Sequence, residues 1–366
     1  MGQPLRIGLV GAGAISGAYL DTLTTLDSLE LVAVADLVPA RARAVLERVP
    51  TAQALEVDEL LAARDVQLVL NLTVPRAHAS VALRAIAQGK MVYGEKPLAA
   101  TAADAAEVLS AAERAGVTLG CAPDTVLGTG IQTARKAIDD GEIGTPISAT
   151  ATMVTPGHEA WHPDPDFYYQ PGGGPLLDMG PYYLSALVTM LGPVVRVSGA
   201  ASRVRAERVI GSGPRRGEVI AVQVDTHVTG VLEHQNGTLS TILMSFDVVG
   251  SHASRIEVHG ERGSLAVPDP NLFDGDVQLR RLGGTGWETM PVSAGYRGAA
   301  RGCGIADLVA AGPGRPPRAS ARLAYHVLEV MERLLESAHG GSRLPVHSTG
   351  ERPEPVPLQE LPGRVG

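Results

Sequence analysis

The sequence predicts an α/β protein with a doubly wound parallel sheet in its N-terminal third and a second domain rich in strands. Residues 5–121 alternate short apolar runs with segments of helical periodicity, which is the pattern of a parallel sheet with crossover helices. Farther along the chain, short alternating runs flank turn signals, as in antiparallel hairpins. The 366 residues are too many for one ordinary core and suit two domains.

The first elements are a strand, a glycine turn, a helix and a second strand. "LRIGLV" (5–10) is an apolar run, and "GAGAISG" (11–17) follows it directly. Gly11 permits the tight turn, and Gly13 lets the backbone approach a pyrophosphate at the helix N-terminus, where amide groups and the helix dipole favour anions. The third glycine position of this fingerprint holds Ser16, with Gly17 next, so the motif is slightly degraded.

The second strand, "LELVAVAD" (29–36), ends in Asp36, where a carboxylate accepts hydrogen bonds from the ribose hydroxyls of a dinucleotide. Asp36 would repel a 2′-phosphate, so NAD is the favoured cofactor. NADP is the alternative because Arg41 follows closely, although Arg41 equally suits a solvated helix face. The predicted dinucleotide site begins with Gly11, Gly13, Ala14, Ile15, Asp36 and Arg41.

The alternation continues with strands near 66–72, 90–94 and 117–121 and with helices near 76–89 and 102–116. In a parallel sheet of this kind, ligands bind beyond the carboxyl ends of the strands. Residues that follow these strand ends are therefore further candidates for contact with the cofactor. They are Thr73, Pro75, His78, Glu95, Lys96 and Asp124.

The second domain reads as β-rich. "VDTHVTGVLEH" and "TLSTILMSF" flank Gln235-Asn236-Gly237, and Asn-Gly between alternating apolar residues predicts a hairpin. "RIEVHG" and "GSLAVP" add two short strands around another turn. Helices are expected over 129–141 and over 322–338, and the apolar face of the latter indicates packing.

Four segments together resemble the Gfo/Idh/MocA oxidoreductases, a family named after glucose–fructose oxidoreductase and inositol dehydrogenase. They are "GLVGAGAISG", "GKMVYGEKPLA", "AIDDGEIGTPISATA" and "GGGPLLDMGPYYL", in this order, and the resemblance runs from about residue 5 to about residue 345. The second and fourth segments are the specific ones, because many families share the glycine fingerprint. The resemblance implies a Rossmann domain, a C-terminal domain built on a large, open, mostly antiparallel sheet, and a cis bond between Lys96 and Pro97.

The resemblance also implies the catalytic residues. Lys96 lies in the Glu-Lys-Pro segment, and Asp178 and Gly180 match the family's Asp-x-Gly-x-His motif, which faces the nicotinamide. Tyr182 takes the His position, as in glucose–fructose oxidoreductase and dihydrodiol dehydrogenase. A phenol needs neighbouring positive charge to act as a base, but in reduction it can donate its proton directly. We expect Tyr182 to transfer the proton, Lys96 to tune it, Asp178 to orient the substrate or Lys96, and Tyr183 to point into packing.

"PGHEAWHPDPDFYYQP" (156–171) precedes the glycine segment and is rich in histidine, aromatic residues and proline, which is typical of a shaped binding loop. His158, Trp161 and His162 are candidate contacts to substrate hydroxyls, with Trp161 suited to the apolar face of a sugar ring; loop packing is the alternative. No third ligand accompanies the two histidines and hydride transfer needs no metal, so no metal is predicted. The predicted substrate site comprises Lys96, His158, Trp161, His162, Asp178 and Tyr182.

Charge and composition exclude several classes of protein. The net charge of −8 argues against a nucleic-acid partner. No stretch approaches the roughly 18 apolar residues of a membrane span, and "MGQPLRIGLVGAG" lacks the apolar core of a signal peptide. Cys121 and Cys303 are expected to be reduced thiols, so we expect a cytoplasmic protein. The resemblance implies a homodimer or homotetramer.

We divide the chain into an NAD(P)-binding domain over 1–123, a substrate-binding α+β domain over 124–345 and a proline-rich strap or tail over 346–366. The predicted function is hydride transfer between C4 of nicotinamide and a secondary alcohol or ketone of a sugar, cyclitol or related polyol. Two alternatives are a redox-neutral enzyme, which would oxidise a sugar transiently, eliminate a substituent and reduce it again, and a non-catalytic NAD(P)-binding regulator.

Overall fold

The chain forms two compact units in the computed structural model, which describes residues 3–312 and 315–363. The N-terminal unit consists of Met1–Thr129, Ala294–Tyr325 and Pro353–Gly366. The central unit consists of Gly130–Ser293 and His326–Arg352. Two late stretches of chain therefore return to the first unit, whereas the division predicted from sequence was contiguous.

A six-stranded parallel sheet forms the centre of the N-terminal unit within its described residues. Its order is β3-β2-β1-β4-β5-β6, so the predicted doubly wound sheet is confirmed. The strands are nearly continuous apolar runs because both faces of such a sheet are covered; Leu68–Asn71, for example, is buried throughout. The strands are β1 (Leu5–Val10), β2 (Leu29–Ala35), β3 (Gln53–Ala54), β4 (Leu68–Asn71), β5 (Met91–Gly94) and β6 (Leu119–Cys121).

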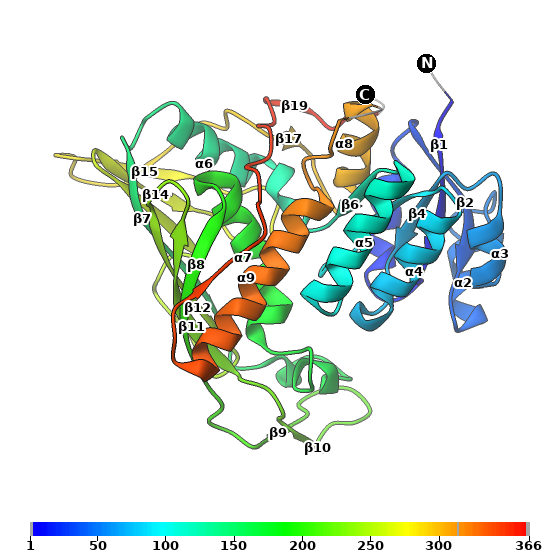
Figure 1. Ribbon diagram of the computed structural model, residues 1–366, viewed down its shortest axis with the longest axis horizontal. Coiled ribbons are helices and arrows are strands. Elements are labelled where there is room, and N and C mark those ends of the chain that lie inside the picture. The colour runs from blue at the N-terminus through cyan, green and yellow to red at the C-terminus, as the bar shows by residue number, and fades with distance from the viewer. Residues whose placement is uncertain (1–2, 313–314, 364–366) are drawn as a thin grey trace. The chain divides into compact units, whose positions relative to one another are not determined.

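The helices between these strands begin and end at residue types that favour helix termini. Proline occupies the first turn of two of them, where its missing N–H is not needed. The hydroxyl of Thr101 caps another by accepting a hydrogen bond from the amide of Asp104, and Gly116, at φ +64°, ends it. Figure 1 shows α4 and α5 side by side on the sheet. The helices are α1 (Ser16–Leu23), α2 (Pro39–Leu46), α3 (Val57–Ala62), α4 (Pro75–Ala87) and α5 (Ala102–Ala115).

The late stretches complete the N-terminal unit. They carry α8 (Cys303–Ala311), β17 (Tyr296–Arg297) and β19 (Gln359–Glu360), and β17 pairs with β19 in parallel. The amide of Asp27 donates to the carbonyl of Gly363 at 3.1 Å. Of the predicted proline-rich segment, residues 353–363 belong to this unit, whereas residues 346–352 belong to the central unit.

A nine-stranded sheet, counted over described residues, forms the central unit, in the order β16-β15-β14-β13-β7-β12-β11-β8-β18. Only β7 and β12 pair in parallel among its described strands, so the expected open, mostly antiparallel sheet is confirmed. The predicted hairpin joins β11 to β12 through Gly237, at φ +89°. The strands are β7 (Pro146–Val154), β8 (Val194–Ser202), β11 (His227–His234), β12 (Leu239–Ser245), β13 (Ile256–Gly260), β14 (Gly263–Val267), β15 (Gln278–Arg281), β16 (Glu288–Thr289) and β18 (Leu344–Pro345). Beside this sheet β9 (Glu207–Val209) pairs with β10 (Val219–Ala221).

Helices α7 (Pro175–Leu191) and α9 (Ala321–Gly340) pack together along this sheet (Figure 1). They approach closely at Gly180, where a Cβ would lie 2.8 Å from the sulfur of Met331. Gly230 of β11 similarly makes room for Leu334. A third helix, α6 (Thr129–Asp139), opens the unit. In the described part of the chain, no helix combines the length and the apolar character needed to cross a bilayer.

A buried histidine on α9 ties the start of β8 to the C-terminal segment. Nε2 of His326 accepts from the amide of Val194 at 3.0 Å, so Nδ1 carries the proton that is shared with Oγ of Ser348 at 2.8 Å. Burial lowers the pKa of His326 to about 4, although Glu329 opposes the shift. Protonation would place a second N–H against the amide of Val194, so this contact holds only for the neutral ring.

We predict that His326 makes the protein less stable in acid. Its pKa lies below the unfolded value of 6.5, so its contribution is complete above pH 6.5 and is lost as the pH falls towards 4. Because the slope approaches about 1.4 kcal/mol per pH unit below pH 6.5, the contribution of His326 to the free energy of unfolding should drop by about 1.5 kcal/mol between pH 6.5 and pH 5. Urea unfolding at both pH values should show this drop in the wild type and a smaller one in His326→Gln. Equal drops would contradict the prediction.

Candidate active site

The glycine turn between β1 and α1 has the shape of a dinucleotide cradle. Gly11 has φ +97°, and a Cβ there would lie 2.6 Å from the carbonyl oxygen of Leu72, so only glycine fits. Gly13 differs, because its φ is ordinary and a Cβ would meet no described atom within 4 Å. The packing of the protein therefore does not explain Gly13, whereas a pyrophosphate lying over the turn does. This open cradle at the start of α1 fits NAD.

Asp36 lies directly after β2 and is bound to the turn. Its Oδ2 accepts from the amide of Ala12 at 2.8 Å, and its Oδ1 accepts from the amide of Val38 at 2.7 Å. Each carboxylate oxygen has a second lone pair for a ribose hydroxyl. Ala14 and Ile15 complete the turn before α1, and Ile15 is its N-cap residue.

The next strand ends are held together by His78. Its side chain is buried on α4, with Nδ1 2.6 Å from the carbonyl oxygen of Pro97 and Nε2 2.9 Å from that of Thr73. The ring thus bridges the loop after β4 and the loop after β5. Pro75 begins α4 between them. His78 was predicted to contact the cofactor, but both of its ring nitrogens are used by backbone carbonyl groups.

The Glu-Lys-Pro loop after β5 is fixed by its glutamate. Glu95 is buried; its Oε1 accepts from the hydroxyl of Tyr19 on α1 at 2.8 Å and its Oε2 from the amide of Lys96 at 2.8 Å. The peptide bond between Lys96 and Pro97 is cis, as the resemblance implied. Glu95 therefore links α1, the helix that follows the dinucleotide turn, to the backbone of Lys96, and the cofactor contact predicted for Glu95 stays a prediction.

Asp124 follows β6 but has no exposed surface. Its Oδ2 accepts from the amides of Gly302 at 2.8 Å and Gly304 at 3.1 Å, at the start of α8. Burial raises the pKa of Asp124, and these hydrogen bonds oppose the increase. The structure thus shows a helix cap at the position for which sequence predicted a cofactor contact. Arg41, also predicted near the cofactor, is exposed on α2.

The glycine-rich segment of the central unit introduces α7. Gly172 and Gly174 have positive φ values of 90° and 94°, and a Cβ on Gly173 would lie 2.4 Å from the carbonyl oxygen of Phe167. The turn delivers Asp178 to the first turn of α7, where the helix dipole favours a carboxylate. Tyr182 lies one turn later, on the same side of the helix.

Tyr183 points into packing, as expected. Its side chain is fully buried, and burial raises the pKa of its phenol. Tyr183 is therefore unsuited to proton exchange with a substrate. Tyr182 is the tyrosine of the motif that lies on the same side of α7 as Asp178.

His158 contacts Asp178 directly, a pairing that the sequence did not predict. Nε2 of His158 lies 3.2 Å from Oδ2 of Asp178, and their side chains are 12% and 19% exposed. His158 belongs to the loop between β7 and α7, and its ring packs edge-on against Trp161 and Tyr168. Trp161 is 59% exposed, as a binding surface requires.

His162 contributes to the same aromatic group. Its ring lies 5.4 Å from that of Trp161, and its Nδ1 accepts from the amide of Asp164. Over the described residues, no group of three or more His, Cys, Asp or Glu side chains has the geometry to hold a metal ion.

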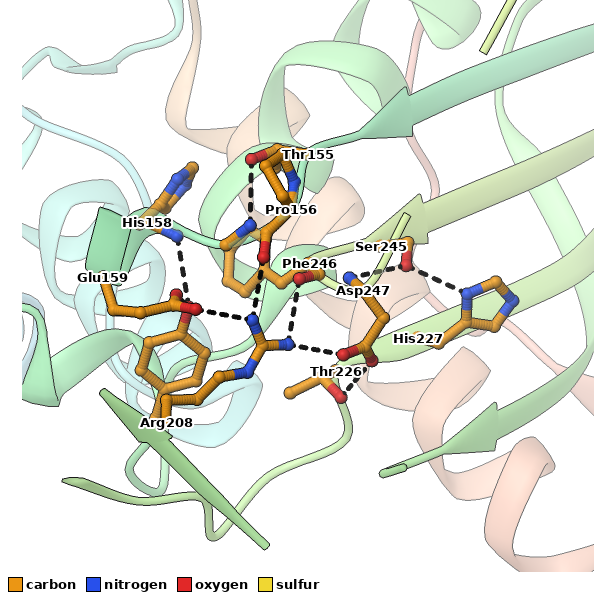
Figure 2. Close-up of polar contacts among 12 residues, drawn as sticks. Thr155, Pro156, His158, Glu159, Arg208, Thr226, His227, Ser245, Phe246 and Asp247 are labelled. Carbon is orange, nitrogen blue, oxygen red and sulfur yellow. Dashed lines mark hydrogen bonds and ion pairs between the residues drawn. The ribbon is translucent and has the colours of Figure 1, made fainter. Parts of the chain in front are cut away.

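A buried arginine anchors the loop that carries His158, as Figure 2 shows. The Arg208 side chain is 1% exposed and donates to Glu159 at 2.7 Å and to the carbonyl oxygen of Pro156 at 2.9 Å. It also donates to Asp247 and to the carbonyl oxygen of Phe246, at the end of β12. No motif in the sequence marked Arg208, which lies on the short strand β9.

Each unit thus brings together a part of the predicted site. The N-terminal unit groups the dinucleotide turn, Asp36, Glu95 and the loop of Lys96. The central unit groups Asp178, His158 and the aromatic rings around them. The approach of Lys96 to Asp178 and Tyr182 stays a prediction.

Comparisons with known proteins agree with this division. A family model described as "Oxidoreductase family, NAD-binding Rossmann fold" matches residues 5–122, and one described as "GFO/IDH/MocA C-terminal domain" matches residues 131–266. The chain is 27% identical over 262 residues to the myo-inositol 2-dehydrogenase of Thermotoga maritima, covering 71% of this chain and 74% of that protein. It is 29% identical over 328 residues to the dTDP-3,4-didehydro-2,6-dideoxy-alpha-D-glucose 3-reductase of Saccharopolyspora spinosa, covering 85% and 92%.

A similar fold occurs in a solved structure of levoglucosan dehydrogenase in complex with NADH and L-sorbose. The TM-score is 0.80 at 21% sequence identity, and the match covers 95% of this chain and 100% of that chain. At this identity the likeness concerns the fold.

We predict that Gly13→Ala weakens NAD binding at least about tenfold while leaving the stability of the free protein unchanged, because the methyl group fills the cradle and touches nothing else. Gly17→Ala is the matched control: it lies in α1, and its Cβ would approach no described atom closer than 3.9 Å. Calorimetric titration with NAD and thermal unfolding of both variants measure the two effects. Wild-type affinity in Gly13→Ala would contradict the prediction.

Proposed function

Because the chain belongs to the Gfo/Idh/MocA family of NAD-binding oxidoreductases, we propose that it transfers a hydride between C4 of nicotinamide and a secondary alcohol or ketone of a sugar, cyclitol or related polyol. Relatives with this chemistry include an inositol dehydrogenase and a reductase of a dTDP-linked sugar, judging from their names. The dinucleotide cradle around Gly13 supports the nucleotide half of the proposal.

The observation that carries the substrate half is the contact of Asp178 with His158 beside an exposed aromatic ring. A carboxylate and an imidazole bind hydroxyl groups by hydrogen bonds. The exposed indole of Trp161, edge-on to His158, suits the apolar face of a sugar ring. Together they favour a ligand with several hydroxyl groups on a compact ring.

Three residues are proposed to act on the reacting hydroxyl. NAD supplies the hydride acceptor when it is bound. Lys96 would hold the hydroxyl oxygen through its ammonium group, Asp178 would orient it, and Tyr182 would lie on the path of its proton. Removal of the hydroxyl proton while hydride leaves carbon lowers the barrier, because charge does not accumulate on the oxygen.

A screen of sugars, inositols and their keto forms against NAD(H) and NADP(H), followed by absorbance, tests this function. Formation of NADH from one polyol, or its consumption by one keto form, is the expected result. Conversion of a sugar with no net change in NADH would instead indicate the redox-neutral reaction. NAD binding without conversion of any polyol would indicate a regulator.

We predict that Lys96→Ala lowers turnover at least about 10²-fold, because the hydroxyl loses its charged partner, while NAD affinity changes little. Lys136→Ala is the control, since that lysine is exposed and pairs with Asp140 on the surface of α6. Steady-state kinetics and NAD titration of both variants give the comparison. Full activity of Lys96→Ala would refute the role.

We predict that Asp36→Asn shifts cofactor preference from NAD towards NADP. The substitution removes the charge that repels a 2′-phosphate and keeps an oxygen for the amides of Ala12 or Val38. The ratio of kcat/KM for NAD to that for NADP should fall at least about tenfold. An unchanged ratio would count against the ribose contact.

A further inference from the structure

We propose that His158 supplies an imidazole for proton transfer, acting with Asp178 as one proton-accepting pair, and that Arg208 is the positioning residue that fixes this pair. The proposal rests on the proposed function, because it names the proton acceptor of that reaction. It assigns an imidazole to a site whose motif carries Tyr182 where the family motif has histidine.

The first observation is the geometry of the pair. Nε2 of His158 and Oδ2 of Asp178 are 3.2 Å apart, within hydrogen-bonding distance, and both side chains keep a small exposed part. A neutral ring that donates through Nε2 leaves Nδ1 without a proton. The pair therefore has the net charge −1 and room for one further proton.

The second observation is the state of Nδ1. This atom is buried and has no hydrogen-bond partner in the described part of the structure. An unsatisfied buried polar atom lowers the stability of a protein, and an apolar side chain at position 158 would avoid this loss. A histidine that served the loop only as packing would not need this atom, whereas a histidine that takes up a proton does.

The third observation is the clamp on both sides of His158. Arg208 binds the carbonyl oxygen of Pro156 and the carboxylate of Glu159, which flank the histidine in sequence. The amide of His158 donates to the hydroxyl of Tyr169 at 3.1 Å, and that hydroxyl donates to Glu159. The guanidinium also lies 5.3 Å from the centre of the Tyr169 ring. Figure 2 shows the contacts of the Arg208 guanidinium with Pro156 and Glu159.

Gly157 is part of the same clamp. It has φ +122°, and a Cβ there would lie 2.2 Å from Oε2 of Glu159 and 2.4 Å from Nη1 of Arg208. The backbone beside His158 is therefore pressed against the ion cluster. The guanidinium of Arg208 also binds Asp247 and Phe246 at the end of β12. Arg208 therefore connects the backbone beside His158 to the sheet.

Other ionisable groups near the pair have partners that keep them distinct from it. Glu159 and Asp247 share the charge of Arg208, and the hydroxyl of Thr226 donates to Asp247 at 2.5 Å. The ring of Tyr168 packs edge-on against His158. Among the described residues of the central unit, the ionisable groups in contact with His158 are Asp178 through Nε2, Tyr168 through its ring and Tyr169 through the backbone amide of His158.

The proton step balances as follows. In oxidation, the carbinol C–H bond gives its electron pair and hydrogen to NAD⁺ as hydride, the O–H bond breaks, and C=O forms. The proton from that O–H bond goes to the pair of His158 and Asp178, whose net charge changes from −1 to 0. Because the two groups share a hydrogen bond, the added proton belongs to the pair and not to one residue. Reduction is the reverse.

The pair can be tested without turnover through Trp161, whose ring lies 5.3 Å from that of His158. A protonated imidazole quenches the fluorescence of an adjacent indole, so the emission of Trp161 reports the charge of His158. Trp287→Phe removes the other tryptophan and His162→Gln removes the other adjacent imidazole. In this background the free protein should show a quenching transition on acidification that His158→Gln abolishes and His227→Gln, the control, leaves unchanged.

The same fluorescence measurement also tests the contact between His158 and Asp178. Asp178→Asn should move the midpoint of the transition to lower pH, because the neutral amide no longer stabilises the imidazolium. An unchanged midpoint would overturn the pair, whatever the substrate of the protein proves to be. Failure of the proposed function would appear separately, as the absence of polyol conversion in the screen.

Kinetics then test whether the pair takes the proton. His158→Gln should lower kcat at least about 10²-fold, with NAD affinity unchanged, and should remove the acidic limb from the pH profile of kcat/KM. Retention of that limb in His158→Gln and its loss in Tyr182→Phe would assign the proton to Tyr182 and overturn the proposal.

Arg208 is tested against Arg215, which binds the same loop through Asp164 and Asp166 at the surface. Arg208→Lys keeps the charge but cannot bind all four acceptors, so it should reduce kcat. In the Arg208→Lys background, Asp178→Asn should also shift the midpoint of the Trp161 quenching transition by less than it does in the wild type. Arg215→Lys should change neither, because surface ion pairs contribute little. Equal behaviour of the two variants would overturn the positioning role, and Arg208→Met, if it folds, should show the larger loss.

Discussion

An arginine side chain that is almost fully removed from water must find acceptors inside the protein, and this requirement organises the central unit around Arg208. Two carboxylates and two backbone carbonyl groups accept from its two terminal nitrogens, whereas Nε has no partner among the described residues; these acceptors come from the loop after β7 and from the end of β12. Removing one partner of such a buried pair typically costs about 3–5 kcal/mol. The glycine at position 157 and the place of His158 against Asp178 both follow from this one cluster.

The N-terminal unit applies the same physical rule to its own reactive loop. Glu95 uses one oxygen for Tyr19 and the other for the amide of Lys96, while His78 spans two backbone carbonyl groups. In each unit, buried polar groups fix the backbone next to a residue proposed to meet the substrate. The residues that position the site are therefore different from the residues proposed to act on the substrate. Substitutions in the two groups should have different effects on the protein.

Sequence predicts well where one local signal decides the structure. The apolar run before Gly11 and the helix after it specify the first crossover, and Asn236-Gly237 specifies a hairpin, because neither depends on distant residues. Long-range pairing is different. Asp124 follows a strand end, as the rim residues do, yet it caps a helix whose residues lie far along the chain.

The candidate site divides in the same way. Gly13 and the cis bond before Pro97 could be predicted from motifs, whereas the contact between His158 and Asp178 joins two segments separated by a loop of irregular shape. Arg208 lies on a strand of three residues that follows Arg203 and Arg205 closely in the sequence, and a segment this short has no periodicity to distinguish the buried arginine. His326 likewise falls within an ordinary amphipathic pattern, and only the packing of α9 shows that it is enclosed.

The pairing of β17 with β19 has a consequence for the order in which a nascent chain can be completed. On the ribosome, the strands of the Rossmann sheet emerge first, but the stretches that complete their unit emerge only after Gly130–Ser293 of the central unit has been made. The first unit to appear is therefore the last to be finished, and its early strands stay partly uncovered until residues 294–325 and 353–363 have been made. Chaperone dependence during synthesis should accordingly be greatest for the half that leaves the exit tunnel first.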